Sequence, residues 1–568
     1  MKFKALHPKK EYSCIRDMVE EIGEIYNGRP AYRYRVNPHD KEAVVVNYEQ
    51  LRDDVRGLAS EFIARDLAGK KIALIGKHTY HWILCYYATM SIGSVLVPLD
   101  RDWSAEDLTE TVKSGECDFV ICDADITEKG DAIASALSLP APVHSVADGE
   151  NSIGAWIAAG KEKFAADSAP YYNAKIDPDA LALLVFTSGT TGKGKGVMLS
   201  QHNFMSDLAD VIQYIDFSTK CMNVLPPHHT YGSSVSIFGQ NSIGCDIYIS
   251  SGVKYILKEL QEHCPGHLVA VPLYVETFYR RIVKGIQDSG KEKLVHFLMK
   301  LSGALRKIGI DLRPLFFKKS ILKSFGGEIN MIISGGAPLN QEMADLFDAI
   351  GITVLNGYGI TECAPILAVN HNNYVVPKSV GPVLDIVDAK IDDPNEDGEG
   401  EILVKGPNVM LGYYKDEEAN AAAFTEDGYF RTGDFGKLEV RKDGARVLYI
   451  TGRLKNLIIL SNGKNVYPEE IEDALAATPG VTDIVVYEGK SRRGDAFNTI
   501  VAEIYPDKNL LDGMGITDYK AHFQKYVNDY NKTAVPYKKI GLLKVREEEF
   551  PKNTLRKILR RKMDMTID

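Results

Sequence analysis

The sequence predicts an α/β protein in which a large N-terminal domain of layered sheets and helices precedes a small, separate α+β domain. Apolar β-branched runs alternate with amphipathic stretches, as in parallel sheets covered by helices. A chain of 568 residues can bury several compact units. Near residue 450 the rhythm changes to short strands and helices. We therefore expect an N-terminal domain over 1–452, a linker over 453–455 and a C-terminal domain over 456–568.

An uncharged segment runs from Trp82 to Leu99. Its pattern changes at Gly93 from helical to β-rich, so we expect a helix, a turn and a buried strand rather than a membrane span. Leu181 to Phe186 reads as another buried strand. A glycine-rich loop follows it, and then apolar residues recur at helical spacing, at Phe204, Leu208, Val211, Ile212 and Ile215.

The same order recurs further along the chain. Met343, Leu346, Phe347 and Ile350 form one helix face that Gly351 ends. A strand over 352–355 and a loop over 356–362 follow. In the C-terminal part, Pro468 begins a helix, and strand-like runs and one more helix occupy 457–460, 483–487, 499–505, 517–530 (the helix) and 540–545.

Composition excludes some classes of protein. The net charge of −10 argues against a general nucleic-acid binder, because phosphate contacts need a basic surface. The eight cysteines include no CxxC pair and are expected to be reduced thiols. The basic N-terminus lacks the apolar core of a signal peptide, which predicts a cytoplasmic protein.

The glycine loop TSGTTGKGKG, Thr187 to Gly196, concentrates the chemistry. Its glycines and hydroxyl residues could wrap phosphate oxygens, and Lys193 and Lys195 add charge. It nearly fits the pattern GxxxxGK[ST], but Gly196 replaces the hydroxyl residue that holds magnesium in that motif. Taken alone, the loop fits a phosphate site or a flexible loop equally well.

Further motifs decide between these interpretations, because the chain resembles the adenylate-forming superfamily of acyl-CoA synthetases, adenylation domains and luciferases. Seven motifs occur in the family's order. Gly194 and Arg556 stand where the family has proline and glycine. The matching segments are Thr187–Gly196, Leu225–Gly232, Ser334–Leu339, Tyr358–Glu362, Tyr429–Asp434, Gly452–Lys455 and Pro551–Lys557.

The resemblance implies a two-step reaction in which ATP and a carboxylate give an acyl-adenylate and pyrophosphate, and CoA then displaces AMP. It places Thr361 at the α-phosphate and Glu362 on Mg²⁺. It assigns the ATP and AMP site to Thr187, Ser188, Gly189, Thr190, Thr191, Gly192, Lys195, Gly336, Ala337, Pro338, Asn356, Gly357, Tyr358, Gly359, Asp434 and Arg453.

Within that site the resemblance implies particular roles. Adenine would lie between the segment Gly336 to Pro338 and Tyr358, with Asn356 reading its edge. Asp434 and Arg453 would bind the ribose hydroxyls. Read without the family, Tyr358 could be a core aromatic residue and Asp434 a turn cap.

The resemblance also implies the moving parts of the catalyst. Lys557 would bridge the carboxylate and the α-phosphate in the first step, although on its own it belongs to a basic tail. Lys455 would lie at the hinge, about which the C-terminal domain turns after adenylation. That turn would present Asn462, Gly463 and Lys464 to CoA, and His229 would gate the acyl and thiol channels; alone, the histidine could be structural.

The residues after His229 favour an uncharged acyl tail, since no carboxylate lies between Thr230 and Cys245 to neutralise a substrate ammonium. We therefore predict an AMP-forming ligase that joins a long-chain fatty acid to CoA. The alternatives are a ligase for medium-chain or aryl acids, one that uses an acyl-carrier protein, or an inactive nucleotide-binding scaffold.

Residues 280–324 carry twelve Lys or Arg and three acids, a charge of +9 in a chain of −10. Leu294, Phe297, Leu298, Leu301, Leu305 and Ile308 form a helical stripe among them. The segment resembles an insert of bacterial long-chain acyl-CoA synthetases. It predicts either peripheral contact with an anionic membrane or a solvated face that packs on the core.

Overall fold

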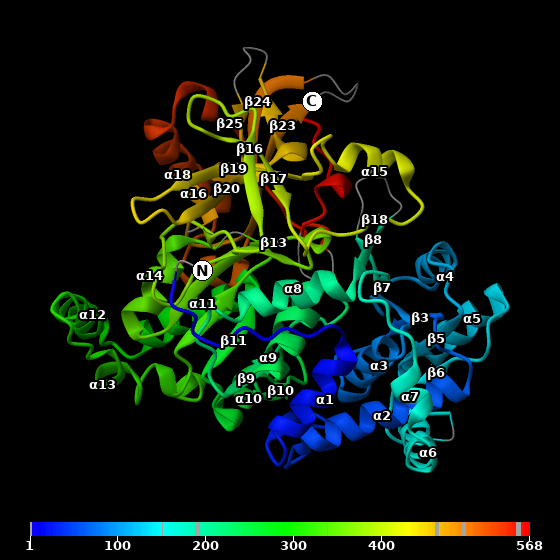
Figure 1. Cartoon of the computed structure of the whole chain (residues 1–568). Helices are drawn as coiled ribbons and strands as arrows, with labels where there is room; N and C mark the ends of the chain where they lie inside the picture. Colours follow the sequence, from blue (N-terminus) through cyan, green and yellow to red (C-terminus); the bar gives the residue numbers. More distant parts are fainter. Residues whose placement is uncertain are drawn as a thin grey trace.

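Two large sheets and a smaller antiparallel sheet build the N-terminal part of the chain (Figure 1). The computed structural model describes residues 3–149, 151–187, 194–337, 339–460, 465–476, 478–490, 496–552 and 558–567. Its layers of sheets and helices confirm the predicted α/β class.

The first large sheet is parallel in its interior and has an antiparallel strand at each edge. In spatial order its strands are β14 (Ile366–Val369), β13 (Thr353–Gly359), β12 (Met331–Ser334), β11 (His267–Ala270), β9 (Lys220–Asn223), β10 (Asp246–Ile249), β1 (Pro30–Tyr34) and β2 (Val44–Asn47).

The second large sheet is parallel from β7 to β6, as the alternating pattern predicts, and antiparallel at the other end. Its strands are β18 (Gly412–Tyr413), β8 (Lys195–Ser200), β7 (Leu181–Thr187), β4 (Val95–Leu99), β3 (Lys71–Ile75), β5 (Phe119–Cys122) and β6 (Val143–His144).

Helix α8 (Gln201–Val211) joins the two large sheets. It contacts β7 and β8 on one side and β14 on the other. Its start is well defined, since the Ser200 hydroxyl accepts from the Asn203 N–H and the Asn203 side chain accepts from the Ser200 N–H. Such a capping arrangement contributes about 1 kcal/mol. Both sheets thus share one apolar core.

The remaining helices of the N-terminal part pack against these sheets (Figure 1). Their bounds are α1 (Ile15–Ile25), α2 (Tyr48–Ala64), α3 (Tyr80–Ser91), α4 (Ala105–Ser114), α5 (Thr127–Leu137), α6 (Ile153–Ala166), α7 (Ala169–Asn173), α9 (Gln240–Ser242), α10 (Ile256–His263), α11 (Pro272–Asp288), α12 (Glu292–Arg306), α13 (Arg313–Phe317), α14 (Gln341–Ile350) and α15 (Glu417–Ala423). Of these, α3 and α9 are almost wholly buried. In the described residues, no helix has the length and apolar character needed to cross a membrane.

Two predicted segments are confirmed in detail. Trp82 to Leu99 forms most of α3, a turn at Gly93 with φ of 71°, and the buried strand β4. Helix α14 is followed by Gly351, which has a φ of 103°. Glycine adopts this left-handed conformation without the steric cost that a side chain would add. The eight cysteines are free, as predicted.

Two other predictions were wrong. The glycine loop was expected to lead from a strand into a helix, but β8 intervenes and pairs antiparallel with β7. The segment from Asn356 to Gly359 was expected to be a loop, but it continues β13. In both places glycine suggested a break, whereas ladder hydrogen bonds from neighbouring strands keep the backbone extended.

A third, all-antiparallel sheet was not foreseen. It contains β15 (Gly381–Pro382), β20 (Arg446–Arg453), β19 (Phe430–Val440), β17 (Gly400–Lys405) and β16 (Asp388–Asp392). The chain leaves this sheet through β20 and enters the short 3₁₀ turn η5 (Leu454–Asn456).

The residues after η5 have an apolar cluster of their own, with Phe523 and Val486 at its centre. Their elements are β21 (Ile458–Ile459), β22 (Asn465–Val466), α16 (Pro468–Ala476), β23 (Val481–Lys490), β24 (Ala496–Pro506), α17 (Lys508–Gly513), α18 (Tyr519–Thr533) and β25 (Ile540–Val545). Each strand or helix predicted after Leu460 is present.

Burial keeps several histidines neutral. It lowers the pKa of His78 to about 3, and the His78 Nε2 has no hydrogen-bond partner among the described residues. In the unfolded chain this histidine binds a proton near pH 6.5. Below that pH the unfolded state therefore binds more protons than the folded one, and stability falls as pH falls.

We predict that His78→Leu reduces the acid sensitivity of the fold. The slope of the unfolding free energy against pH between 6 and 4.5 should fall by about 1.4 kcal/mol per pH unit, the contribution of one proton. Urea denaturation at several pH values measures this slope. The exposed His39 supplies the control, because His39→Leu should leave the slope unchanged; an unchanged slope in both variants would contradict the prediction.

Candidate functional site

A cavity of about 1170 Å³ lies where strands of both large sheets end. Its walls include residues at or just beyond the carboxyl ends of β4, β7, β12 and β13, namely Asp100, Thr187, Gly335, Gly336, Ile360, Thr361 and Glu362. Parallel strands point their carboxyl ends the same way, so loops that follow different strands meet there. The cavity therefore occupies the place where this class of fold binds ligands.

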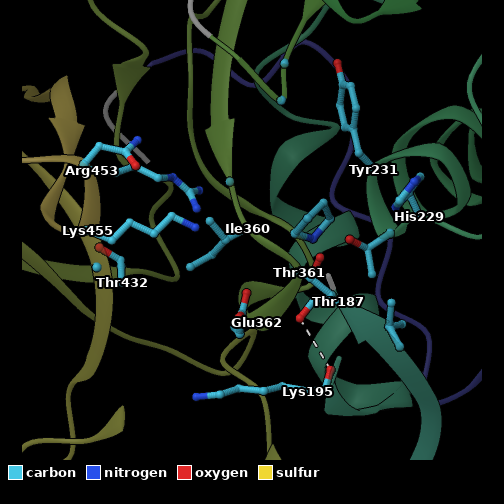
Figure 2. A pocket seen from close by; sticks show the side chains of 18 of the residues that line it. Thr187, Lys195, His229, Tyr231, Ile360, Thr361, Glu362, Thr432, Arg453 and Lys455 are labelled. Carbon is cyan, nitrogen blue, oxygen red and sulfur yellow. Dashed lines mark hydrogen bonds between the residues drawn. The ribbon is translucent and has the colours of Figure 1, made fainter. Parts of the chain in front are cut away.

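Glu362 lies in the 3₁₀ turn η4 (Thr361–Cys363) and faces the cavity (Figure 2). The Tyr413 hydroxyl donates to Glu362 Oε1 over 3.1 Å. The Lys195 Nζ lies 4.6 Å from the centre of the Tyr413 ring. One tyrosine thus links a carboxylate and an ammonium group, and Thr361, beside Glu362, adds a hydroxyl to the same wall.

The end of β13 lies very close to the backbone of Pro365, and this close approach depends on glycine. A Cβ on Gly359 would lie 2.0 Å from the Pro365 carbonyl oxygen. No side chain fits there, which explains why the motif before Thr361 has this residue. Gly336 and Gly357 also line the cavity. Asn356 is half-buried and Ala337 is exposed, and neither is among the residues that line the cavity. Pro338 lies outside the described residues.

Asp434 and Arg453 form an ion pair across neighbouring strands. The register of β19 and β20 sets the two residues opposite each other, and the Arg453 Nε lies 2.8 Å from Asp434 Oδ1. The Tyr358 hydroxyl donates to the other Asp434 oxygen over 2.6 Å. Burial and the carboxylate raise the pKa of Tyr358, so it remains a donor. Tyr358 is therefore a buried positioning group here as well as the predicted adenine neighbour.

Lys455 follows this pair in the turn η5 and extends its amino group into the cavity, toward Ile360 (Figure 2). Desolvation lowers its pKa, and nearby Arg453 lowers it further. The positive charge is thus held close to the carboxylates that line the cavity rather than in open solvent. This placement is more specific than that of a linker lysine.

Of the glycine loop, the structure describes the two ends, Thr187 and Gly194 to Gly196. The Thr187 hydroxyl donates to the Lys195 carbonyl oxygen over 3.4 Å (Figure 2). A Cβ on Gly194 would lie 2.6 Å from the Thr187 carbonyl oxygen, so the departure from the family's proline has a steric reason in this chain. The predicted phosphate ligands Ser188, Gly189, Thr190, Thr191 and Gly192 lie outside the described residues.

His229 lines the cavity beside His228, with ring centres 4.3 Å apart. Burial lowers the pKa of His229 to about 3 and that of His228 to about 4. Both Nε2 atoms lack hydrogen-bond partners in the described part of the chain. The His228 Nε2 lies 3.8 Å from Asp100 Oδ2, which is too far for a hydrogen bond. A neutral ring whose Nε2 forms no hydrogen bond can turn at low cost, which is compatible with the predicted role of His229 as a gate.

Beyond the histidines the cavity is apolar. Its walls there belong to α8 and the residues after it, to the π-helix η2 (Tyr231–Gly239), and to β12 and β14. The side chains are Val211, Ile215, Val235, Ile333, Ile366 and Val369. The charged residues of the cavity come from other elements, so this end accommodates an uncharged tail.

Residues of the C-terminal part close the cavity. Ile558, Leu559 and Arg560 line it, and Arg560 donates to the Val486 carbonyl oxygen over 2.7 Å and pairs with Glu472. The predicted catalytic Lys557 lies outside the described residues, although Ile558, the next residue, is at the wall. Asn462, Gly463 and Lys464, predicted to meet CoA, also lie outside them.

Sequence reasoning missed some cavity residues. Tyr413 belongs to none of the motifs compared, since it lies between Glu362 and Tyr429. His228 was visible as the first of two adjacent histidines, but only the second matches the family motif. Lys490 and Arg560 approach the cavity from strands and turns far along the chain. Only the tertiary structure could place these four residues together.

A model of the family described as AMP-binding enzyme matches residues 20–414. The chain belongs to the AMP-binding enzyme family. The match includes Thr187 and Lys195 at the two ends of the glycine loop, His228 and His229, and the turn with Glu362, and these residues line the cavity. The predicted superfamily is thereby confirmed.

This AMP-binding enzyme has relatives along most of its length. It is 28% identical to the long-chain-fatty-acid–[acyl-carrier-protein] ligase AEE15 of Arabidopsis thaliana, over 85% of this chain and 75% of that one. It is 27% identical to the long-chain-fatty-acid–CoA ligase FadD15 of Mycobacterium bovis, over 82% and 77%. The chain is therefore an acid–thiol ligase of this family.

Solved structures agree on the fold of the AMP-binding enzyme. ATP-bound MatB from Rhodopseudomonas palustris matches with a TM-score of 0.74 at 25% identity, over 96% of this chain and 97% of that one. The anthranilate CoA ligase AuaEII, in complex with anthranoyl-AMP, matches with a TM-score of 0.76. At 16% identity the second likeness supports the fold alone.

Proposed function

We propose that this AMP-binding enzyme activates a long-chain fatty acid with ATP and Mg²⁺ and transfers the acyl group to CoA. One observation carries the proposal: a single cavity joins an apolar, uncharged end to a wall of charged and hydroxyl groups. A fatty acid has the same division between tail and carboxylate. The names of AEE15 and FadD15 support the substrate class.

The first step is an electrostatic problem, because a carboxylate must attack a polyphosphate. Lys455 and Lys195 already face the cavity, and Lys557, one residue before the wall residue Ile558, is proposed to bridge the two anions. Asp434 and Arg453 would hold the ribose, with Tyr358 fixing the orientation of Asp434. An oxygen of the ionised carboxylate attacks the α-phosphorus of ATP, which forms the acyl-adenylate and releases pyrophosphate.

Magnesium would enter as part of the nucleotide substrate. Glu362 suits it, because carboxylate oxygen is a ligand that hard cations prefer, and the Tyr413 hydroxyl occupies only one of its oxygens. Thr361 supplies a second oxygen on the same turn. When bound, the cation neutralises phosphate charge.

The second step requires a thiol to reach the acyl carbon. We assign the gate to His229 and the hinge to 453–455, where η5 joins two clusters that have separate apolar cores. A rotation there would withdraw Lys557 and bring Asn462, Gly463 and Lys464 to CoA. The domain bounds 1–452 and 456–568 belong to the same proposal.

The acceptor and the acid are the finer parts of the proposal. AEE15 is named for an acyl-carrier protein and FadD15 for CoA, so the comparisons support both acceptors. The apolar end favours an alkyl chain over an aryl acid with polar substituents. A scaffold without activity is disfavoured by the presence of Glu362, Asp434, Lys455 and Lys557 in one chain. An anionic membrane surface would be a further partner, as the holder of the fatty acid.

The test of substrate is pyrophosphate release across a panel of carboxylates, with and without CoA. Long-chain acids should be preferred at least tenfold over short ones, because each methylene in an apolar pocket contributes about 1–3 kcal/mol. Val235→Phe should move the preference toward shorter acids by filling the apolar end, whereas Val440→Phe, on the surface, should not. Preference for aryl or short acids in the unchanged protein would contradict the proposal.

We predict that Glu362→Gln raises the Mg²⁺ concentration needed for adenylation by about tenfold or more, because a neutral amide is a weaker ligand for a hard cation. The measurement is a magnesium titration of pyrophosphate release. Glu488→Gln, in the same cavity but without a proposed metal role, is the matched control. If both variants titrate like the wild type, Glu362 does not bind the cation.

The two half-reactions should separate by mutation. Lys557→Ala should slow adenylate formation about 100- to 1,000-fold, as expected on removing a preorganised cation, and spare thioester formation from supplied acyl-AMP. Lys455→Pro fixes φ at the hinge but also removes a cation from the cavity, so it should slow thioester formation from acyl-AMP more than it slows adenylate formation. Lys562→Ala, an exposed lysine of the same basic tail, should change neither. Equal loss of both steps in both variants would contradict a two-conformation mechanism.

A further inference from the structure

Helix α12 has two apolar faces, and only one of them is covered. Val295, Leu298 and Met299 pack on the apolar cluster beside α14, and Ser302 is buried with them. On the other face Leu294 is 52% exposed, Phe297 60% and Leu301 36%. The stripe expected from the sequence is thus divided between a buried face and an exposed face.

The exposed apolar surface continues past the end of the helix. Ile308 is 71% exposed, Ile310 45% and Leu315, in α13, 73%. Figure 1 shows α12 and α13 projecting at one side of the molecule, beyond α14 and away from the second large sheet. Six large apolar side chains therefore face solvent within about twenty residues of chain.

Cations surround this surface, and most lack a partner. Among the twelve Lys and Arg of 280–324, all of which the structure describes, four pair with acids: Arg280, Arg306, Arg313 and Lys318. The other eight are exposed and form no ion pair with the described residues; they are Arg281, Lys284, Lys291, Lys293, Lys300, Lys307, Lys319 and Lys323. The surface combines exposed apolar groups with uncompensated positive charge.

We infer that the exposed face of α12, with the turn that leads to α13, is a docking surface for anionic lipid membranes. An interfacial helix needs apolar side chains to enter the acyl region and cations to meet anionic headgroups, and this face has both. It deepens the proposed function, since a membrane would hold the fatty acid, but the surface itself does not depend on the reaction.

A second copy of the chain is a poorer occupant. Bringing two such faces together would oppose their unpaired cations, and like charges across an interface are repulsive. Arg306, one of the twelve cations of residues 280–324, does not add to the unpaired charge, because it pairs with Asp348 over 2.5 Å. The lysines that remain beside the exposed face are Lys291, Lys293, Lys300 and Lys307.

The test is co-sedimentation of the full chain with vesicles of phosphatidylglycerol mixed with phosphatidylcholine, and of phosphatidylcholine alone. Binding should occur only with the anionic vesicles and should weaken as salt rises. Each lysine near an anionic surface contributes about fivefold, so replacing Lys291, Lys293, Lys300 and Lys307 with Gln should weaken binding at least about 50-fold. Leu294→Ser with Phe297→Ser and Ile308→Ser should also abolish it.

Control variants make the same kinds of substitution at exposed positions outside the proposed docking surface. Lys113, Lys175, Lys442 and Lys520 are exposed lysines without an ion pair among the described residues, and replacing them with Gln should leave binding within about twofold of the wild type. Val36→Ser with Val440→Ser is the control for the apolar set. Adenylation of a soluble, short acid should be unchanged in all variants, which separates this inference from the proposed reaction.

Three results would overturn the inference: equal sedimentation of wild type and lysine variants, binding to neutral vesicles that is independent of salt, or no vesicle binding at all. Sedimentation of the protein without vesicles tests the alternative occupant, a second copy of the chain. If the wild type is a dimer that does not bind vesicles, and the triple variant with Ser at 294, 297 and 308 is a monomer, the face is an interface between two copies.

Discussion

The structure depends on two sheets delivering the carboxyl ends of their strands to one cavity. Helix α8 makes this possible, because it packs on β7 and β8 with one side and on β14 with the other. The residues that follow β4, β7, β12 and β13 then reach a common space without long loops. Thr187 ends a strand of the second large sheet, and Glu362 follows a strand of the first. A shift of either sheet would therefore separate these two residues.

Charge within that space is arranged by burial. Desolvation lowers the pKa values of His228 and His229 and keeps both rings neutral, although the charge of Asp100 acts in the opposite direction on His229. Desolvation lowers the pKa of Lys455 and nearby Arg453 lowers it further, while Asp434 and Glu362 act in the opposite direction. A polyphosphate that enters would meet cations already close together, and the repulsion among them would be relieved on binding. Burial raises the pKa values of Tyr358 and Tyr413, so both tyrosines remain neutral. Their hydroxyl groups donate hydrogen bonds to Asp434 and Glu362, respectively.

The C-terminal part meets the cavity through contacts that differ in kind from those of the core. Arg560 and Lys552 are anchored by ion pairs within their own region, to Glu472 and Asp483. Arg280 of α11 reaches across to the Val481 carbonyl oxygen and to Asp507. Polar contacts of this sort are exchanged with water at small cost, which is compatible with the proposed rotation about η5.

The sequence by itself determined the fold class, the elements with strong periodicity and the family. The strand at 181–186, the helix that ends at Gly351 and the C-terminal strands follow from local pattern, because side-chain spacing reports helix and strand directly. Motif order identified Thr187, Thr361, Glu362, Asp434, Arg453 and Lys455 as one site, and the structure brings these residues together. Local pattern was wrong at β8 and at the end of β13, where glycines read as breaks but pairing with neighbouring strands keeps the chain extended. Only the tertiary structure joined Tyr413 to Glu362, Tyr358 to Asp434, and divided α12 into a packed and an exposed face. Periodicity shows that a helix has an apolar side, but it contains no information about which neighbour covers it.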